Sequence, residues 1–306
     1  MKTPPDRNIS PHNAFTLPEL LVVIAIILLL GTLLIPVAIK AEVADHNAVC
    51  LANLKALSQS WILYANDNND RLIGAGNWVA GVMVGATISP SMTNTQPITD
   101  GRLWKYHPSL QIYQCPAEPA WPPGEAQTVQ RVRSYSLNCN SAGASVQGRG
   151  PNGKLNAYPP FTRLAQIRFP GPAQNLTFIH ENEYSIDDGL FAIEVGGNDP
   201  IPTAVRWRNQ PTGRHDNGAV LGFADGHSEH WKWTQDYLSK GVFRPGFPGN
   251  LTVGSNGADA KSPPGAGNGF PVYYPPMGAK DPDLQRISLV ILDKLSWDLA
   301  ERGGGL

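Results

Sequence analysis

The strongest constraint on the fold is a run of uncharged residues near the amino terminus. From Leu20 to Ile39 the sequence reads LLVVIAIILLLGTLLIPVAI, without a charged side chain. At 1.5 Å rise per residue, a helix of roughly twenty residues matches the hydrocarbon core of a bilayer, about 30 Å thick. A cleaved signal peptide would have a shorter run and a small-x-small site, and residues 39–41 are a poor site. We therefore expect a transmembrane helix.

The charges that flank this run predict its orientation. The short head before it carries Lys2 and Arg7 against Asp6. Because positive charges favour the cytoplasmic side, we expect the head in the cytoplasm and everything after Lys40 outside. An exported domain can contain oxidised cysteines.

The overall charge argues against a nucleic-acid partner. The 306-residue chain has 24 Lys and Arg against 25 Asp and Glu, a formal net charge of -1, so no positive excess is available to hold a phosphate backbone. With 31 Gly and 28 Pro, the chain should be rich in loops. Its length fits two domains or one large β-rich domain.

One carboxylate, Glu19, lies at the start of the apolar run. Burying it would cost on the order of 2–3 kcal/mol, and less near the membrane interface. It can simply mark the water boundary and interact with the positive end of the helix dipole. Alternatively, it can pair with a cation from another chain.

The residues around Glu19 resemble a known export signal. Residues 14–25, AFTLPELLVVIA, are similar to the class III signal of type IV prepilins and type II secretion pseudopilins, in which a short basic leader precedes F-T-x-x-E and an apolar helix. The resemblance implies that a prepilin peptidase cuts between Ala14 and Phe15 and methylates the Phe15 nitrogen. It also implies that Glu19 pairs with the terminal amine of a neighbouring subunit. Ala14 departs from the usual Gly before the cut.

The helix should continue beyond the apolar run to about residue 65. Short amides and carboxylates at 66–70 then favour a turn, and they lack the further ligands and the glycine of a calcium loop. We expect one face of this helix to pack on an antiparallel sheet, as in pilins, with Cys50 as a small buried hydrophobe. That face has helical spacing: Val43, Cys50, Leu54, Leu57, Trp61 and Tyr64.

The exported domain should consist of short strands joined by long loops. Runs such as 176–179 and 189–193 are β-like and are bounded by Gly, Pro, Asn and Asp. A disulfide between Cys115 and Cys139 would close a loop of roughly 25 residues and stabilise by about 3 kcal/mol. Two unpaired thiols are an almost equal alternative.

The clearest local pattern lies at residues 214–231. Asp225-Gly226 predicts a two-residue type I′ hairpin, with Val220 opposite Trp231. His215 completes an H-X9-DG pattern that resembles prepilin-type processing-associated proteins, whose C-x-N-L-K-like and C-P elements match residues 50–55 and 115–116. The motif residues are therefore His215, Asp225 and Gly226.

The same segment offers metal ligands, although a structural hairpin is the favoured interpretation. Imidazoles and carboxylates suit metals or hydrolysis, but no HExxH or GxSxG sequence occurs. Some secretion pseudopilins bind calcium in this distal region, so Asp225 is the candidate metal residue. The groups considered are His215, Asp225, His227, Glu229 and His230.

The last part of the chain combines a loop and a helix. Residues 241–282 are rich in Gly and Pro and should form a long surface loop. Asp283 can cap a short amphipathic helix that packs back on the domain. Its apolar positions are Leu284, Ile287, Ile291 and Leu295.

Together these patterns predict an α+β, pilin-like protein: a leader at 1–14, a transmembrane and assembly helix at 15–65, an antiparallel β-rich extracytoplasmic domain at 66–240 and a loop with a helix at 241–306. We expect a pseudopilin-like structural subunit of the inner membrane, not an enzyme, without a required cofactor. Its partners would be the prepilin peptidase and other pilin or pseudopilin subunits. The alternative is a membrane-anchored extracytoplasmic metal- or glycan-binding protein or hydrolase. Secretion, adhesion and DNA uptake remain open.

Overall fold

A computed structural model describes a large part of the chain, in two compact units, Met1–Ala44 and Asp45–Leu306. The predicted leader, the cleavage residues Ala14 and Phe15, and most of 241–306 lie outside the described residues. These are 17–81, 83, 90–120, 126–143, 146–149, 155–158, 160–168, 171–183, 185–186, 188–195, 205–207, 209–234, 283 and 286–287, without the side chains of 31, 33–41, 146–149, 155–158, 194–195 and 205–207.

The first element is a single long helix, α1 (Leu17–Asp67). Pro18 lies in its first turn, where no intrahelical acceptor is lost. The helix ends where Asn69 and Asp70 adopt positive φ angles of 55° and 66°, a conformation that short polar residues tolerate. The Asn68 amide donates to the carbonyl of Tyr64 at 2.7 Å and satisfies one of the last free carbonyls. The predicted end near residue 65 is confirmed.

In the first unit, the described side chains of α1 are mostly apolar and exposed. All residues from 17 to 30 are exposed, and Leu20, Ile24 and Leu28 have exposed fractions of 52%, 44% and 64%. Within the described residues, no helix has the combined length and apolarity of a membrane span.

The second unit is built on a mixed five-stranded sheet with the order β5-β1-β4-β8-β9. The α+β class is therefore confirmed, but the expectation of a purely antiparallel sheet is wrong, because β5 pairs with β1 in parallel. The other neighbours are antiparallel. The five strands are β1 (Tyr135–Asn138), β4 (Leu176–His180), β5 (Leu190–Phe191), β8 (Gly218–Phe223) and β9 (Ser228–Lys232).

Two small antiparallel ribbons accompany this sheet. They pair β2 (Val146–Arg149) with β3 (Leu155–Tyr158), and β6 (Ile193–Val195) with β7 (Val205–Trp207). The run predicted as one strand at 189–193 is thus divided between β5 of the main sheet and β6 of a ribbon.

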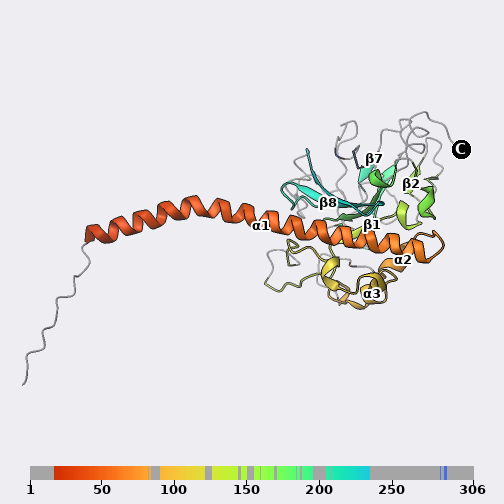
Figure 1. Ribbon diagram of the computed structural model, residues 1–306, viewed down its shortest axis with the longest axis horizontal. Helices are drawn as coiled ribbons and strands as arrows, with labels where there is room; N and C mark the ends of the chain where they lie inside the picture. Colours follow the sequence, from red (N-terminus) through yellow and green to blue (C-terminus); the bar gives the residue numbers. More distant parts are fainter. Residues whose placement is uncertain are drawn as a thin grey trace, which may run out of the picture. The chain divides into compact units, whose positions relative to one another are not determined.

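The C-terminal part of α1 packs on one face of the main sheet, as the helical spacing predicts (Figure 1). Leu54, Leu57 and Trp61 have no exposed surface and share a core cluster with Phe178 and Val220 of the sheet. Small residues bring helix and sheet close together. The Ser58 hydroxyl lies 2.7 Å from that of Thr177 in β4, and a Cβ on Gly222 of β8 would lie 2.4 Å from the Ser58 oxygen.

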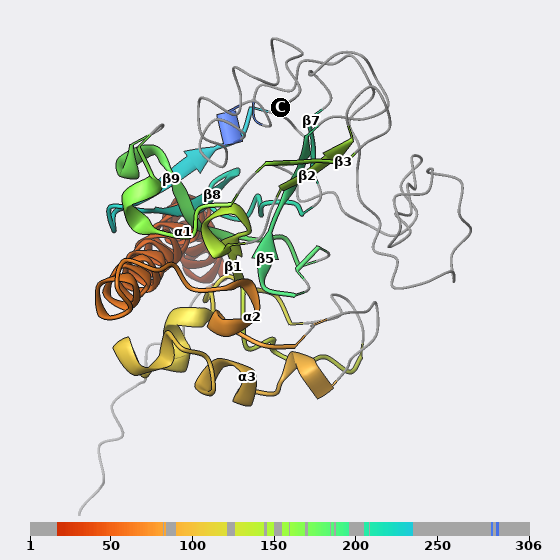
Figure 2. The same ribbon diagram turned by 90° about the vertical axis from the view of Figure 1, so that its right-hand side faces the viewer.

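A segment of short helices covers another side of α1, so the helix lies between this segment and the sheet (Figure 2). Trp78, Ile98 and Tyr113 bring the segment into the same core cluster. The short helices are α2 (Ala75–Trp78), η1 (Pro90–Met92), α3 (Gln96–Thr99), η2 (Trp104–Tyr106) and η3 (Leu110–Tyr113), followed along the chain by η4 (Asn140–Ala142), η5 (Leu164–Gln166) and η6 (Pro172–Gln174).

The predicted hairpin forms between β8 and β9, but its predicted register is wrong by one residue. Val220 pairs with His230 rather than with Trp231, and the Phe223 amide donates to the His227 carbonyl. The loop therefore contains three residues, with Gly226 at φ 90°, which is the G1-bulge arrangement rather than a type I′ turn. A one-residue shift moves side chains to the opposite face.

The far face of the sheet carries a second core cluster, which contains Trp231. Ile287 from the C-terminal segment is fully buried in this cluster, and the Arg286 guanidinium lies 3.7 Å from the centre of a Trp231 ring. The carboxylate of Asp283 accepts a hydrogen bond from the Thr234 amide at 2.8 Å. These contacts agree with a C-terminal segment that packs back on the domain, and the rest of its predicted helix lies outside the described residues.

Candidate functional site

Two cysteines and two histidines meet between α1 and the sheet. Cys50 lies on α1, Cys115 follows η3, His180 ends β4 and His215 precedes β8. One side-chain atom from each, a sulfur or a ring nitrogen, lies within 4.8 Å of the other three. All four residues have no exposed surface. We call these four residues the Cys/His cluster.

The atoms of the Cys/His cluster are in close contact. The Sγ atoms of Cys50 and Cys115 are 2.8 Å apart. Nδ1 of His180 lies 2.8 Å from Nε2 of His215, and the same Nε2 lies 3.5 Å from the sulfur of Cys115. Four atoms that can bind a metal therefore lie close together, although their residues come from separate segments of the chain.

The outward nitrogen of each histidine ring contacts an oxygen. Nε2 of His180 lies 3.2 Å from Oε2 of Glu118, and Nδ1 of His215 lies 2.6 Å from Oδ1 of Asn47 on α1. These contacts fix the orientation of both rings and direct the remaining nitrogens towards each other.

Glu118 is a buried carboxylate whose charge is compensated by two arginines. Arg131, itself 1% exposed, donates to one carboxylate oxygen, and Arg214 donates to the other at 3.3 Å. Burial alone would raise the pKa of Glu118, but Arg214 and Arg131 outweigh it and hold that pKa well below its usual range. The carboxylate therefore stays ionised beside His180.

For the thiol of Cys115, in contrast, the effect of burial on the pKa prevails. Removal from water raises the pKa of the Cys115 thiol, and its contact with Cys50 raises it further.

The Cys115 loop is held in place by the Ser134 hydroxyl, which accepts a hydrogen bond from the Cys115 amide at 3.0 Å. Asn53 of α1 donates to the carbonyls of Gln111 and Gln114 at 3.2 and 3.0 Å.

The sequence motifs contribute unequally to the cluster. His215 is part of it, and its loop is shaped by Asp216 and Asn217, which both have positive φ. Asp225 and Gly226 lie in the β8–β9 loop instead. Asp225, the candidate metal residue from the sequence, contacts His227 on the partly exposed hairpin and is not one of the four clustered residues.

The cysteines are arranged differently from the sequence prediction. The structure describes all three cysteines and joins none of them in a disulfide, so the predicted Cys115–Cys139 bond is absent from it. Cys115 lies against Cys50, while Cys139 belongs to the core cluster on the far face of the sheet. Cys50 is buried as expected, but it contacts a second sulfur as well as apolar side chains.

Motif reasoning missed His180 altogether. Zinc signatures place ligands a few residues apart, whereas Cys50 and Cys115 are separated by 65 residues and His180 and His215 by 35. The only usable signal was the coincidence of the C-x-N-L-K-like, C-P and H-X9-DG elements in one chain, which supplies three of the four residues.

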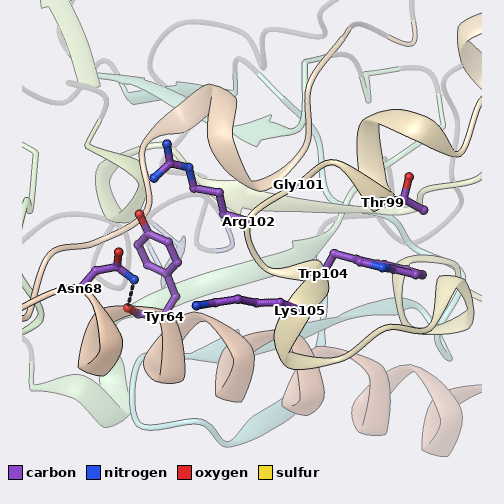
Figure 3. Close-up of a pocket in the computed structure, with 7 residues that line it drawn as sticks. All are labelled: Tyr64, Asn68, Thr99, Gly101, Arg102, Trp104 and Lys105. Atoms are coloured by element: carbon purple, nitrogen blue, oxygen red, sulfur yellow. Dashed lines mark hydrogen bonds between the residues drawn. The ribbon is translucent and has the colours of Figure 1, made fainter.

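A separate surface pocket of about 340 Å³ lies over the end of α1 (Figure 3). Its polar groups are engaged in part with each other: Asn68 caps the helix through the Tyr64 carbonyl. It has no clustered histidines or cysteines. The residues that line it are Tyr64, Asn68, Thr99, Gly101, Arg102, Trp104 and Lys105.

The two residues of the predicted cleavage site lie outside the described part of the chain, whereas Glu19 lies in the first turn of α1. A carboxylate at this position interacts favourably with the positive end of the helix dipole. Comparison with known proteins adds no relative, because no family model, curated protein or solved structure matches this chain.

Proposed function

We propose that this chain is a pseudopilin-like structural subunit of a type II secretion or type IV pilus-like assembly, matured by a prepilin peptidase. The observation that carries the proposal is the amino-terminal part of α1. Every residue from 17 to 30 is exposed in an uninterrupted helix, and after Glu19 the described side chains of this stretch are almost all apolar. A helix that is apolar on all sides is typically buried, either in a membrane or among other helices.

The amount of exposed apolar surface supports burial in an assembly. Leu21, Ile27 and Leu29 have exposed fractions of 58%, 61% and 62%. Full burial of one such side chain is worth about 1.5–3 kcal/mol. Several of these residues together would favour burial of this part of the helix, either in a membrane or against other subunits.

Glu19 gives the proposal its specificity. Its position five residues into the chain that begins at Phe15 is the position of the glutamate in the prepilin signal. In a bundle of apolar helices, a carboxylate is tolerated when a cation compensates it. The methylated amine of a neighbouring Phe15 would be that cation, so the same residue would set the axial register between subunits.

The division of the chain into two units is consistent with this role. Residues from Asp45 onward form a unit with its own cores, in which the second part of α1 is one packing layer. The amino-terminal part would insert and assemble, while this unit faces the extracytoplasmic side. The proposed location is the inner membrane, with the unprocessed leader in the cytoplasm.

The test combines maturation with assembly. Intact mass and amino-terminal sequencing of the protein from its native membrane should give a chain that begins at N-methylated Phe15. Glu19→Ala should abolish recovery of cross-linked oligomers while leaving the protein in the membrane fraction. Glu42→Ala is the matched control, because it removes an exposed carboxylate from the same helix outside the apolar run.

Two results would contradict the proposal. A mature protein that retains Met1, or one cut near Ala41, would show that the prepilin pathway does not process it. Oligomers that survive Glu19→Ala as well as they survive Glu42→Ala would show that α1 is only an anchor, as in the alternative of a membrane-anchored binding protein or hydrolase.

A further inference from the structure

The Cys/His cluster has the donor set of a zinc site. Two thiolates and two imidazoles are ligands that bind Zn²⁺ in tetrahedral structural sites. We propose that Cys50, Cys115, His180 and His215 bind one Zn²⁺ that fastens α1 to the sheet. This inference does not depend on the proposed role in assembly, because it concerns only the folded unit from Asp45 onward.

The spacing of the donor atoms suits one small cation. Zinc–sulfur and zinc–nitrogen bonds of about 2.0–2.3 Å in a tetrahedron place the ligand atoms roughly 3.3–3.8 Å from each other. The four atoms lie within 4.8 Å of one another, and the closest pairs are at 2.8 Å. Shifts of about 1 Å or less in these side chains would therefore complete the coordination sphere.

The two histidine rings already have the orientation of zinc ligands. Ligating histidines donate their second ring N–H to a carboxylate, a carbonyl or water. Here the outward nitrogens of His180 and His215 contact Glu118 and the Oδ1 atom of Asn47. If both outward nitrogens carry the proton, two lone pairs face each other at 2.8 Å, and a cation between them removes the repulsion.

Without a bound ion, the contact between the two histidines and the contact between the two cysteines need separate explanations. If the Asn47 amide is turned so that its nitrogen donates, a chain of hydrogen bonds can run through His215 and His180 to Glu118. That arrangement does not involve the sulfurs of Cys50 and Cys115, whose 2.8 Å contact then needs its own explanation, a thiol–thiol hydrogen bond or a disulfide. One Zn²⁺ accounts for all four groups at once.

Charge balance and burial indicate a structural rather than a catalytic zinc. Zn²⁺ with two thiolates has no net charge, so the filled site would suit a location where the ligand residues have no exposed surface. The neighbouring charge of Glu118 is compensated by Arg131 and Arg214. Catalytic zinc keeps a position open to substrate, whereas four protein ligands close the sphere.

The first experiment measures metal in the untagged full-length protein, purified in detergent without chelator. Mass spectrometry of the metal content should give about one Zn²⁺ per chain. Cys50→Ser and Cys115→Ser should lower zinc content at least about tenfold. Cys139→Ser is the matched control, because Cys139 is a buried cysteine outside the cluster, and it should retain zinc.

A second experiment works even if the serine variants fail to fold. The wild-type chain is unfolded with reductant and chelator and refolded with Co²⁺, which should give the visible ligand-field and thiolate charge-transfer bands of a tetrahedral site. Addition of Zn²⁺ should abolish these bands and raise the midpoint of thermal unfolding.

Three outcomes would overturn the inference. The first is the absence of zinc from the isolated protein together with the absence of cobalt bands after refolding. The second is equal zinc content in Cys50→Ser and Cys139→Ser, which would mark binding elsewhere. The third is a Cys50–Cys115 disulfide in the mass spectrum of the unreduced native protein, because thiols joined in this way cannot ligate zinc as a pair.

Discussion

Replacement of Gly222 by alanine tests the close contact between α1 and the sheet. A Cβ at this position would lie 2.4 Å from Oγ of Ser58 and 3.1 Å from the backbone oxygen of Leu54. Real Cβ atoms essentially never approach closer than 3.0 Å, so the hydroxyl would have to move by roughly 0.6 Å or more. The Leu54 oxygen belongs to the helix backbone and cannot rotate away.

The expected loss of stability follows from the movement that the new methyl group forces on Ser58. Overpacking of this kind costs about 1–3 kcal/mol. Rotation of Ser58 away from the new methyl also breaks its buried 2.7 Å contact with Thr177, which adds about 1 kcal/mol or more. We expect Gly222→Ala to lower the free energy of unfolding by about 2–4 kcal/mol.

The assay is urea-induced unfolding of the full-length chain in detergent, followed by tryptophan fluorescence, because Trp61 and Trp78 are fully buried. Ser58→Ala should also destabilise, since it leaves the Thr177 hydroxyl without this partner. The double variant should cost less than the sum of the single variants by about 1 kcal/mol, because the new methyl takes the space of the lost oxygen.

Gly76→Ala is the control for the general effect of replacing glycine. No atom lies within 4 Å of a Cβ at Gly76, so this change should be neutral or stabilise by up to about 1 kcal/mol. If Gly222→Ala is as harmless as Gly76→Ala, or if the costs of Gly222→Ala and Ser58→Ala simply add, the close packing inferred for α1 on β8 is refuted.

Three further predictions concern the ion pair beside the cluster and the hairpin loop. Arg131→Met should cost about 3–5 kcal/mol in urea unfolding, because it removes a cation from the buried Glu118, and Arg131→Met combined with Glu118→Leu should cost less than the sum of the two changes. Gly226→Ala should cost about 1–2 kcal/mol, because φ is 90° there, and an unchanged urea midpoint would contradict the loop geometry. Asp225 has a pKa below its usual range: partial burial would raise the pKa, but hydrogen bonds from His227 outweigh it. Asp225→Asn should therefore destabilise by no more than about 1 kcal/mol at neutral pH, and this difference should vanish as pH falls through about 4 and below. A difference that persists at low pH would refute the role of the carboxylate charge.

The long helix and the face that it buries could be predicted because both depend on local periodicity. Leu54, Leu57 and Trp61 recur at helical spacing, and a helix with such a stripe can bury only that stripe. The end of α1 was predictable for the same reason, since the polar residues after Asp67 bond to the nearby backbone.

The sheet could be predicted only in part. Asp225-Gly226 signals a hairpin, but it fits a two-residue turn as well as a three-residue loop with a glycine bulge. A tertiary contact decides between them: the Ala224 amide donates to the Asn175 carbonyl at 2.9 Å, so Ala224 does not pair with the opposite strand. The parallel pairing of β5 with β1 likewise depends on a partner distant in sequence.

Besides its apolar stripe, α1 has a polar stripe, and the residues of this polar stripe contact the Cys/His cluster and its loop. Asn47, Cys50 and Asn53 recur every three residues, so they lie on one side of the helix. Asn47 contacts His215, Cys50 contacts Cys115, and Asn53 binds the carbonyls before Cys115.

A helix held only by apolar contacts could shift along the sheet by one turn, about 5.4 Å, and still bury a similar surface. The same shift would break all three polar contacts at once and leave their partners buried without hydrogen bonds, at about 1–3 kcal/mol each. The polar stripe therefore fixes the register of α1 on the sheet. Because α1 continues without interruption to Leu17, this register also fixes which helical residue leaves the folded unit.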